Sequence, residues 1–208
     1  MDVAGAQDLF GTWVAPALLG LGLAAASGLR IFVPLLMAAL AAKFQLFGIE
    51  LNESVAWVTS NAAIAALAVA TVVEILADKI PVLDNALHAV GIVARPVAGA
   101  VAAGSVFAGL DPTTAAIAGI IVGAPTALAF GAAQGGTRAA STATTGGLGN
   151  PVLSVIEDVL AFLTVLIAFV IPLLVPVVLA LLLLAVWRLF RRVKRSVTPD
   201  GAQRRSGA

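Results

Sequence analysis

The chain has 208 residues, of which 61% are apolar and only 11% are charged, and its mean hydropathy is +1.07. Soluble domains carry about twice that share of charged residues, so too little polar surface remains here to cover a water-soluble core. The absence of cysteine excludes disulfides and thiolate metal sites, and the single histidine excludes a multi-histidine metal centre within one chain. The long apolar runs are continuous rather than alternating, which predicts membrane-spanning helices and not a β-barrel.

The first apolar stretch runs from about Trp13 to Ala42. Its thirty residues would form a helix of about 45 Å, too long for one upright span. Ser27, Gly28, Arg30 and Pro34 lie in its middle, so we expect a break or kink there. The residues before this stretch are acidic, whereas a cleaved signal peptide needs a basic start, so we expect it to be retained as a span.

The middle of the chain predicts three further spans. The second runs from about Val55 to Ala77, and the less apolar residues 82–94 suit a short interfacial or re-entrant segment. A short span rich in glycine and alanine follows from about Pro96 to Leu110, and the fourth span runs from about Thr113 to Ala133. Pro112 suits the first position of that fourth helix, where its missing N–H is not needed.

The last part combines a Gly-rich stretch with a long apolar block. Residues 134–151 are the least lipid-like and predict a second helix break. Residues 152–187 would form one helix of about 54 Å, so we expect two short spans that turn near Pro172 and Pro176. The predicted fold is therefore all-α: a polytopic transmembrane bundle of about six spans, within a range of five to seven.

Three parts are expected along the chain: a cytoplasmic or interfacial segment (1–11), one transmembrane helical domain (12–190) and a basic, disordered cytoplasmic tail (191–208). The basic residues from Arg188 to Arg205 directly follow the last span, so the positive-inside rule predicts a cytoplasmic C-terminus and contacts with anionic lipids. Six spans would place the N-terminus in the cytoplasm as well. Nucleic-acid binding is not expected, because the basic run lacks a folded platform and interleaved aromatic residues. We expect a multi-pass protein of the cell membrane.

Charged residues inside or beside the predicted spans carry the functional information. Each costs several kcal/mol in hydrocarbon, on the order of 3 or more at the bilayer centre, unless it is paired, hydrated or near the interface. We therefore expect these side chains to face the bundle interior or a cavity, with snorkelling to the headgroups as the alternative. They are Arg30, Glu74, Asp78, Lys79, Arg95, Arg138, Glu157 and Asp158.

Two pairs of carboxylates stand out by their spacing. Glu74 and Asp78 are four residues apart and share a helix face with Thr71. This row would bind a cation or carry a proton, or else neutralise an arginine in a structural pair; the sequence leaves both open. Glu157 and Asp158 are adjacent in the first turns of a helix, where the helix dipole favours negative charge, so a purely structural role is equally open.

A faint internal duplication is visible. Residues 27–30 (SGLR) are similar to 135–138 (GGTR), and 74–77 (EILA) are similar to 158–161 (DVLA). Repeats that contain broken helices are typical of secondary transporters, although the spacing here differs greatly between the two halves.

Other glycines predict close helix packing rather than a site, because small residues let helix backbones approach. They are Gly99, Gly104, Gly119 and Gly123, the last two with G-x-x-x-G spacing.

Four strings in the chain resemble a known family: GLAAASGLRIFVPLL (22–36), VEILADKIP (73–81), RPVAGA (95–100) and STATTGGLGNPVLSVIEDVLA (141–161). Together they resemble the bacterial membrane family named domain of unknown function 4126, over about residues 20–190. The resemblance implies the fold and a membrane location, here the bacterial inner membrane, but no activity. It implies that the family's motif positions are Arg30, Glu74, Asp78, Lys79, Pro81, Arg95, Pro96, Asn150, Pro151, Glu157 and Asp158.

Three functions are compatible with this pattern. In a small secondary transporter or permease, Arg30 and Arg138 would hold an anionic solute, and Glu74 with Asp78 would carry the coupling ion. The first alternative is a non-catalytic scaffold, assembly factor or partner subunit in which every buried charge is paired internally. An intramembrane enzyme acting on lipid phosphates would need a metal held by carboxylates, with Asp84 among them, and no complete catalytic motif supports it.

No cofactor is expected, and the candidate partners are the bilayer, a small solute or ion and further copies of the chain. The candidate substrate or ion site comprises Arg30, Glu74, Asp78, Lys79, Arg138, Asn150, Glu157 and Asp158.

Overall fold

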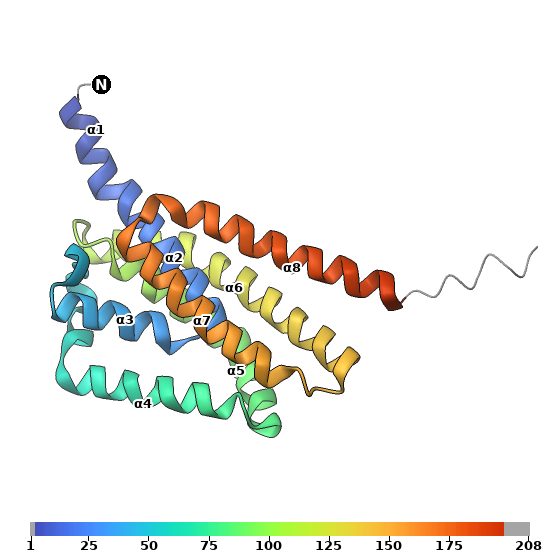
Figure 1. Cartoon of the computed structure of the whole chain (residues 1–208). Helices are drawn as coiled ribbons and strands as arrows, with labels where there is room; N and C mark the ends of the chain where they lie inside the picture. Colours follow the sequence, from blue (N-terminus) through green and yellow to red (C-terminus); the bar gives the residue numbers. More distant parts are fainter. Residues whose placement is uncertain (1–2, 198–208) are drawn as a thin grey trace, which may run out of the picture.

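The computed structural model describes residues 3–197, without the side chains of residues 3, 4, 6, 81–88, 189, 190 and 192–197. The described part of the chain forms eight α-helices joined by short 3₁₀ and π turns and contains no strand. The predicted all-α class is therefore confirmed. Most helices run roughly along one another, whereas α1 (Val3–Leu9) projects from one end of the bundle (Figure 1).

The predicted helix break in the first apolar stretch is confirmed. A π-helical turn (Phe10–Val14) leads into α2 (Ala15–Leu29), and α3 (Phe32–Lys43) starts again after Arg30. Arg30 itself is extended, with φ −138° and ψ 121°. Pro34 lies in the first turn of α3, where its missing N–H leaves no helical hydrogen bond unmade.

The predicted second span is bent. A 3₁₀ segment (Glu53–Thr59) and α4 (Asn61–Ala77) meet at an angle of 73°. Ser60 lies at the bend, and its side chain accepts a hydrogen bond from the Ala63 N–H, which caps α4. The chain therefore changes direction before α4 begins.

The predicted re-entrant segment at 82–94 and separate span at 96–110 are wrong. One helix, α5 (Pro81–Ser105), covers 25 residues and passes through Pro96. A proline inside a membrane helix is tolerated where neighbouring helices support the freed backbone, and α5 packs closely on α6. The less apolar residues 82–94 therefore form the first turns of a longer helix; the side chains of Asp84 and His88 lie outside the described residues.

The predicted break at 134–151 is wrong for most of its length. Helix α6 (Pro112–Thr145) continues for 34 residues, and only residues 146–149 leave it, with Gly146 and Gly147 at positive φ. Gln134 and Arg138 lie on the same face of this helix and bind Glu157 of α7. The helix stays continuous through Gly135 and Gly136, which lie between them. As predicted, Pro112 occupies the first helical position.

The predicted turn near the two late prolines is confirmed. Helix α7 (Asn150–Val170) ends before a 3₁₀ turn (Pro172–Leu174), and α8 (Val175–Val197) follows. Helix α8 thus extends into the predicted tail, whose residues 198–208 lie outside the described part. The end of α8 lies at the opposite end of the bundle from α1 (Figure 1).

The predicted count of six spans is not confirmed. Within the described residues, three helical segments are long and apolar enough to cross a membrane, namely Gln7–Leu29, Pro112–Thr145 and Asn150–Val170. The bent pair of the 3₁₀ segment and α4 would make a fourth, and three further apolar helices are shorter. Large apolar side chains such as Ile92 and Ile121 are exposed on the outer surface, which fits a bilayer as solvent.

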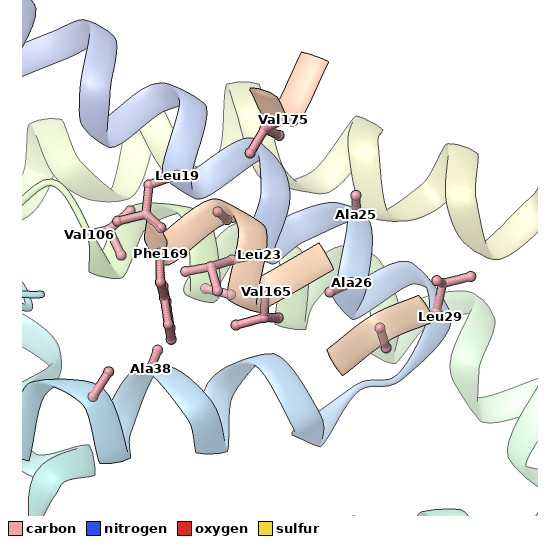
Figure 2. Close-up of a cluster of buried hydrophobic side chains, with 14 of the residues drawn as sticks. Leu19, Leu23, Ala25, Ala26, Leu29, Ala38, Val106, Val165, Phe169 and Val175 are labelled. Atoms are coloured by element: carbon pink, nitrogen blue, oxygen red, sulfur yellow. The ribbon is translucent and has the colours of Figure 1, made fainter. Parts of the chain in front are cut away.

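The core surrounds α2. Leu19 and Leu23 of this helix pack with Val106 of the turn after α5 and with Val165 and Phe169 of α7 (Figure 2). Residues 23–26 of α2 are at most 1% exposed, so the second half of this helix is enclosed on all sides. Arg30, which directly follows α2, therefore lies in the protein interior.

The predicted close packing of the four glycines is confirmed at the contact of α5 and α6. A Cβ atom on Gly123 would lie 2.1 Å from the carbonyl oxygen of Gly99, and one on Gly119 would lie 2.4 Å from that of Ala100. Both distances are impossible for a real side chain, so the two backbones touch because these positions are glycine.

Candidate functional site

Two arginines and one carboxylate form the centre of a buried network. Arg30 follows α2 and is 1% exposed, and Asp78 is the C-cap of α4. The Arg30 Nη1 donates to Asp78 Oδ2, and the Arg138 Nη2 of α6 lies 2.8 Å from the same oxygen. One oxygen atom therefore joins α2, α4 and α6.

Helix α7 adds two more carboxylates. The Arg138 Nη2 is 2.5 Å from Glu157 Oε2, and its Nε is 3.2 Å from both oxygens of that carboxylate. Asp158 Oδ1 lies 2.6 Å from the Arg30 Nε, and Glu157 Oε2 lies 3.8 Å from the Arg30 Nη2. We call these five residues the ion-pair network: Arg30, Asp78, Arg138, Glu157 and Asp158.

Two neutral side chains complete the hydrogen bonding of the network. Ser154 accepts from the Arg30 Nη2 through both its carbonyl oxygen (3.1 Å) and its Oγ (3.0 Å). The Gln134 Nε2 donates to Glu157 Oε2 at 2.7 Å and to the Leu29 carbonyl at 3.3 Å. The sequence prediction missed both residues. Spacing could have found Gln134, which precedes Arg138 by one helical turn and shares its face.

Glu74 lies next to the network but has a different contact. Its two carboxylate oxygens accept from the backbone N–H groups of Ile31 (2.8 Å) and Phe32 (3.2 Å). These are free donors at the start of α3, where the helix dipole also favours a negative charge. The Glu74 carboxylate therefore holds the helix break in place.

The remaining predicted residues lie at the margin or apart. Lys79 is 39% exposed, and its Nζ is 3.9 Å from Asp158 Oδ2. Asn150 lies away from the network, at the α6–α7 connection, where its Nδ2 donates to the Thr142 Oγ1 at 3.1 Å. Thr71 is buried, and its hydroxyl has no partner among the described residues. The proposed row of Thr71, Glu74 and Asp78 thus does not act as one group in this conformation.

Arg95 of α5 is the charged residue that the network leaves out. Among the described residues, no hydrogen bond or ion pair reaches it, and its Nε is buried without a partner. It borders a pocket of about 300 Å³ between α5 and α6. A Cβ on Gly131 would lie 3.1 Å from the Arg95 Cδ and 3.4 Å from the Gly28 carbonyl oxygen. The backbone of α6 at Gly131 therefore lies between the Arg95 side chain and α2.

A second pocket of about 270 Å³ lies between α6, α7 and α8. Its wall is apolar except for Gln134, Thr137 and Glu157. Neither pocket is lined by Arg30, Asp78 or the Glu74 carboxylate. In the described part of the chain, no group of three or more His, Cys, Asp or Glu side chains is arranged to hold a metal ion.

Comparison with known proteins gives one match, to a family model. No curated protein and no solved structure matches the chain significantly. A family model described as a domain of unknown function matches residues 17–192, which include every member of the ion-pair network. The chain therefore belongs to the domain of unknown function 4126 (DUF4126) family.

Proposed function

We propose that this membrane protein is a small secondary transporter for an anionic solute, and that the ion-pair network changes between the states of its cycle. One observation carries the proposal: buried charges join α2, α4, α6 and α7 at the helix break. A buried ion pair gives little net stability compared with well-packed apolar side chains, because both charges lose their water. A network of this cost favours a role in switching over a role in holding the fold.

The positions of the contacts support such a switch. Asp78 Oδ2 serves both arginines, so its release would detach the end of α4 from α2 and α6 together. Glu74 holds the first N–H groups of α3, so a proton on this carboxylate would weaken the anchor of the broken helix. Broken helices with ends that face charged groups recur in secondary transporters.

The charge balance supports coupling to protons. Counting the charged residues of the site and its margin, Arg30, Lys79, Arg95 and Arg138 give four positive charges, and Glu74, Asp78, Glu157 and Asp158 give four negative charges. The sum is zero when all are ionised. An added anion would leave a surplus negative charge in a medium of low dielectric constant, and one proton on a carboxylate would remove it.

Transport is tested in proteoliposomes that contain a pH-sensitive dye, with lactate and nitrate gradients as probes. Wild type should show anion-dependent proton uptake, and Glu74→Gln should abolish it because this side chain no longer titrates. Glu53→Gln is the matched control, since Glu53 is exposed outside the bundle and should leave the flux unchanged. Flux that is insensitive to Glu74→Gln, or folded wild type that moves neither probe, would count against a proton-coupled carrier of this class.

A non-catalytic scaffold or partner subunit is the second candidate. Two observations favour it: the arginines of the network are bound to internal carboxylates, and neither described pocket reaches Arg30 or Asp78. In this case network variants would reduce the free energy of unfolding and no probe anion would move. The proteoliposome and unfolding measurements together therefore separate the two candidates.

A further inference from the structure

Arg95 is half-buried and poses an energetic problem that the buried Arg30 and Arg138 do not. Arg30 and Arg138 each bind two or more carboxylates, whereas no described side chain forms an ion pair with Arg95. Glu157 and Glu74 act on its charge at longer range, without forming an ion pair with it. An arginine in hydrocarbon without a counter-ion is costly, and such residues commonly mark a substrate or ion pathway.

Arg95 lies inside the apolar part of α5, which runs from Ala89 to Ser105. It follows Ala89 by six residues and precedes Ser105 by ten, which correspond to about 9 Å and 15 Å of helix. The hydrocarbon layer is about 30 Å thick, and an arginine side chain can snorkel only over a fraction of that depth. A headgroup anion and a free organic anion can therefore both reach this guanidinium, and the test below distinguishes them.

The pocket beside Arg95 has the character of a site for an organic anion. Its volume is about 300 Å³, at the lower end of the range for small-molecule pockets. Apart from Arg95 the lining is apolar or glycine, with Ile92, Pro96, Leu128 and Ala132 as the larger contributors. Ile92 and Leu128 are more than half exposed, so the pocket opens on the outer, lipid-facing side of α5 and α6.

We propose that Arg95 and this pocket bind a monocarboxylate with an apolar body that enters from the bilayer. One guanidinium matches one carboxylate, and it binds both oxygens in a planar, charge-assisted pair. The apolar lining suits a hydrocarbon body better than a hydrated inorganic ion. As a statement of substrate class this rests on the proposed transport function, but binding itself does not depend on it.

Binding is tested with hexanoate labelled with ¹³C at the carboxyl carbon. The full-length protein in nanodiscs of zwitterionic phosphatidylcholine is titrated, and the carboxyl resonance is followed by NMR. Wild type should show saturable binding. Arg95→Gln should weaken it by about tenfold or more, because the planar pair of charge-assisted hydrogen bonds is lost. Lys43→Gln removes a positive charge at the far end of α3 and should leave the affinity unchanged.

Two further arms keep the result interpretable if Arg95→Gln folds poorly. Ala132→Phe fills the pocket from its exposed side and keeps the arginine, and it should also abolish binding. Hexanamide has the same shape without the charge and should not compete. The site is refuted if hexanoate binding does not saturate, or if Arg95→Gln and Ala132→Phe bind hexanoate as wild type does. It is also refuted if hexanamide competes as well as hexanoate. Displacement of hexanoate by a small mole fraction of anionic phosphatidylglycerol in the nanodisc would refute it too, because the site would then bind a lipid headgroup.

The two proposals fail separately. Saturable, Arg95-dependent binding without flux would leave the site standing and remove the transporter. Flux that depends on Glu74, together with hexanoate binding that ignores Arg95→Gln, would leave the transporter standing and remove this site.

Discussion

Removal of the Arg138 guanidinium should cost far more stability than removal of an exposed charge. Arg138 is 8% exposed and binds Glu157 through Nε and Nη2 and Asp78 through Nη2. In Arg138→Met, Glu157 keeps Gln134 as a close donor but loses its nearest positive charge. Loss of one partner of a buried ion pair typically costs about 3–5 kcal/mol, because the other charge stays buried. We expect a loss in this range for Arg138→Met and a comparable loss for Glu157→Gln.

The double variant tests whether this loss comes from the pair itself. With both partners replaced, no uncompensated charge remains at this contact, so the combined loss should fall short of the sum by about 0.5–3 kcal/mol. The free energy of unfolding is measured by reversible SDS-driven unfolding in mixed micelles, followed by circular dichroism. Glu53→Gln, on the exposed 3₁₀ segment, should change it by less than about 0.5 kcal/mol. Strict additivity of the two losses, or an Arg138→Met variant as stable as wild type, would refute the reasoning.

Three further changes probe the helix contacts. Gly123→Ala should lower the free energy of unfolding by about 1–3 kcal/mol, because its Cβ would meet the Gly99 backbone. Gly109→Ala is the control: a Cβ there has nothing within 4 Å, so this variant should unfold at the same temperature as wild type. Glu74→Ala should speed hydrogen exchange at the first two amides of α3 more than Glu74→Gln does, since glutamine keeps an acceptor oxygen; equal rates would contradict the capping role. Hydrogen bonds from Thr114 and its neighbour lower the pKa of Asp111, the N-cap of α6. This contribution is present above the unfolded-state pKa and lost as pH falls through the lowered value. The protection factors of the first α6 amides, which correct for the intrinsic pH dependence of exchange, should therefore fall in acid in wild type but not in Asp111→Asn.

The sequence could predict that buried charged side chains meet inside the bundle, but not which of them form ion pairs. Ionised groups in hydrocarbon must find partners, so the sequence indicates that Arg30, Arg138 and Glu157 face inward. It does not indicate which carboxylate each arginine binds, since Asp78 and Arg138 are sixty residues apart and meet only through the tertiary fold. The alternative in which Glu74 and Asp78 pair with an arginine holds for Asp78, whereas Glu74 binds backbone N–H groups that no side-chain pattern encodes.

The errors in predicting helix breaks have one physical cause. Glycine weakens a helix in water by about 1 kcal/mol, and that penalty suggested an interruption at residues 134–151. Inside a bundle the same residue permits close approach, as Gly131 does between α2 and α5, and packing outweighs propensity. At residues 27–34 the break was predicted correctly, because Pro34 and the charged Arg30 act together there. Composition alone does not separate these two uses of glycine.

Charge balance connects the network to the Arg95 pocket and can be measured. If the described site is neutral when empty, a monocarboxylate at Arg95 adds one negative charge to a group that already contains Glu157, Glu74 and Asp78, all of which act on the Arg95 charge. Binding should then draw about one proton into the protein, because protonation of the Glu74 carboxylate costs less than an unbalanced buried charge. Calorimetric titration of hexanoate in buffers of different ionisation enthalpy reports that proton number directly. A number near one, reduced in Glu74→Gln and unchanged in Glu53→Gln, would show that anion and proton are taken up together. A number near zero at full occupancy would mean that Arg95 alone neutralises the bound anion and that no proton is needed. The argument for coupling would then fail even with the site intact.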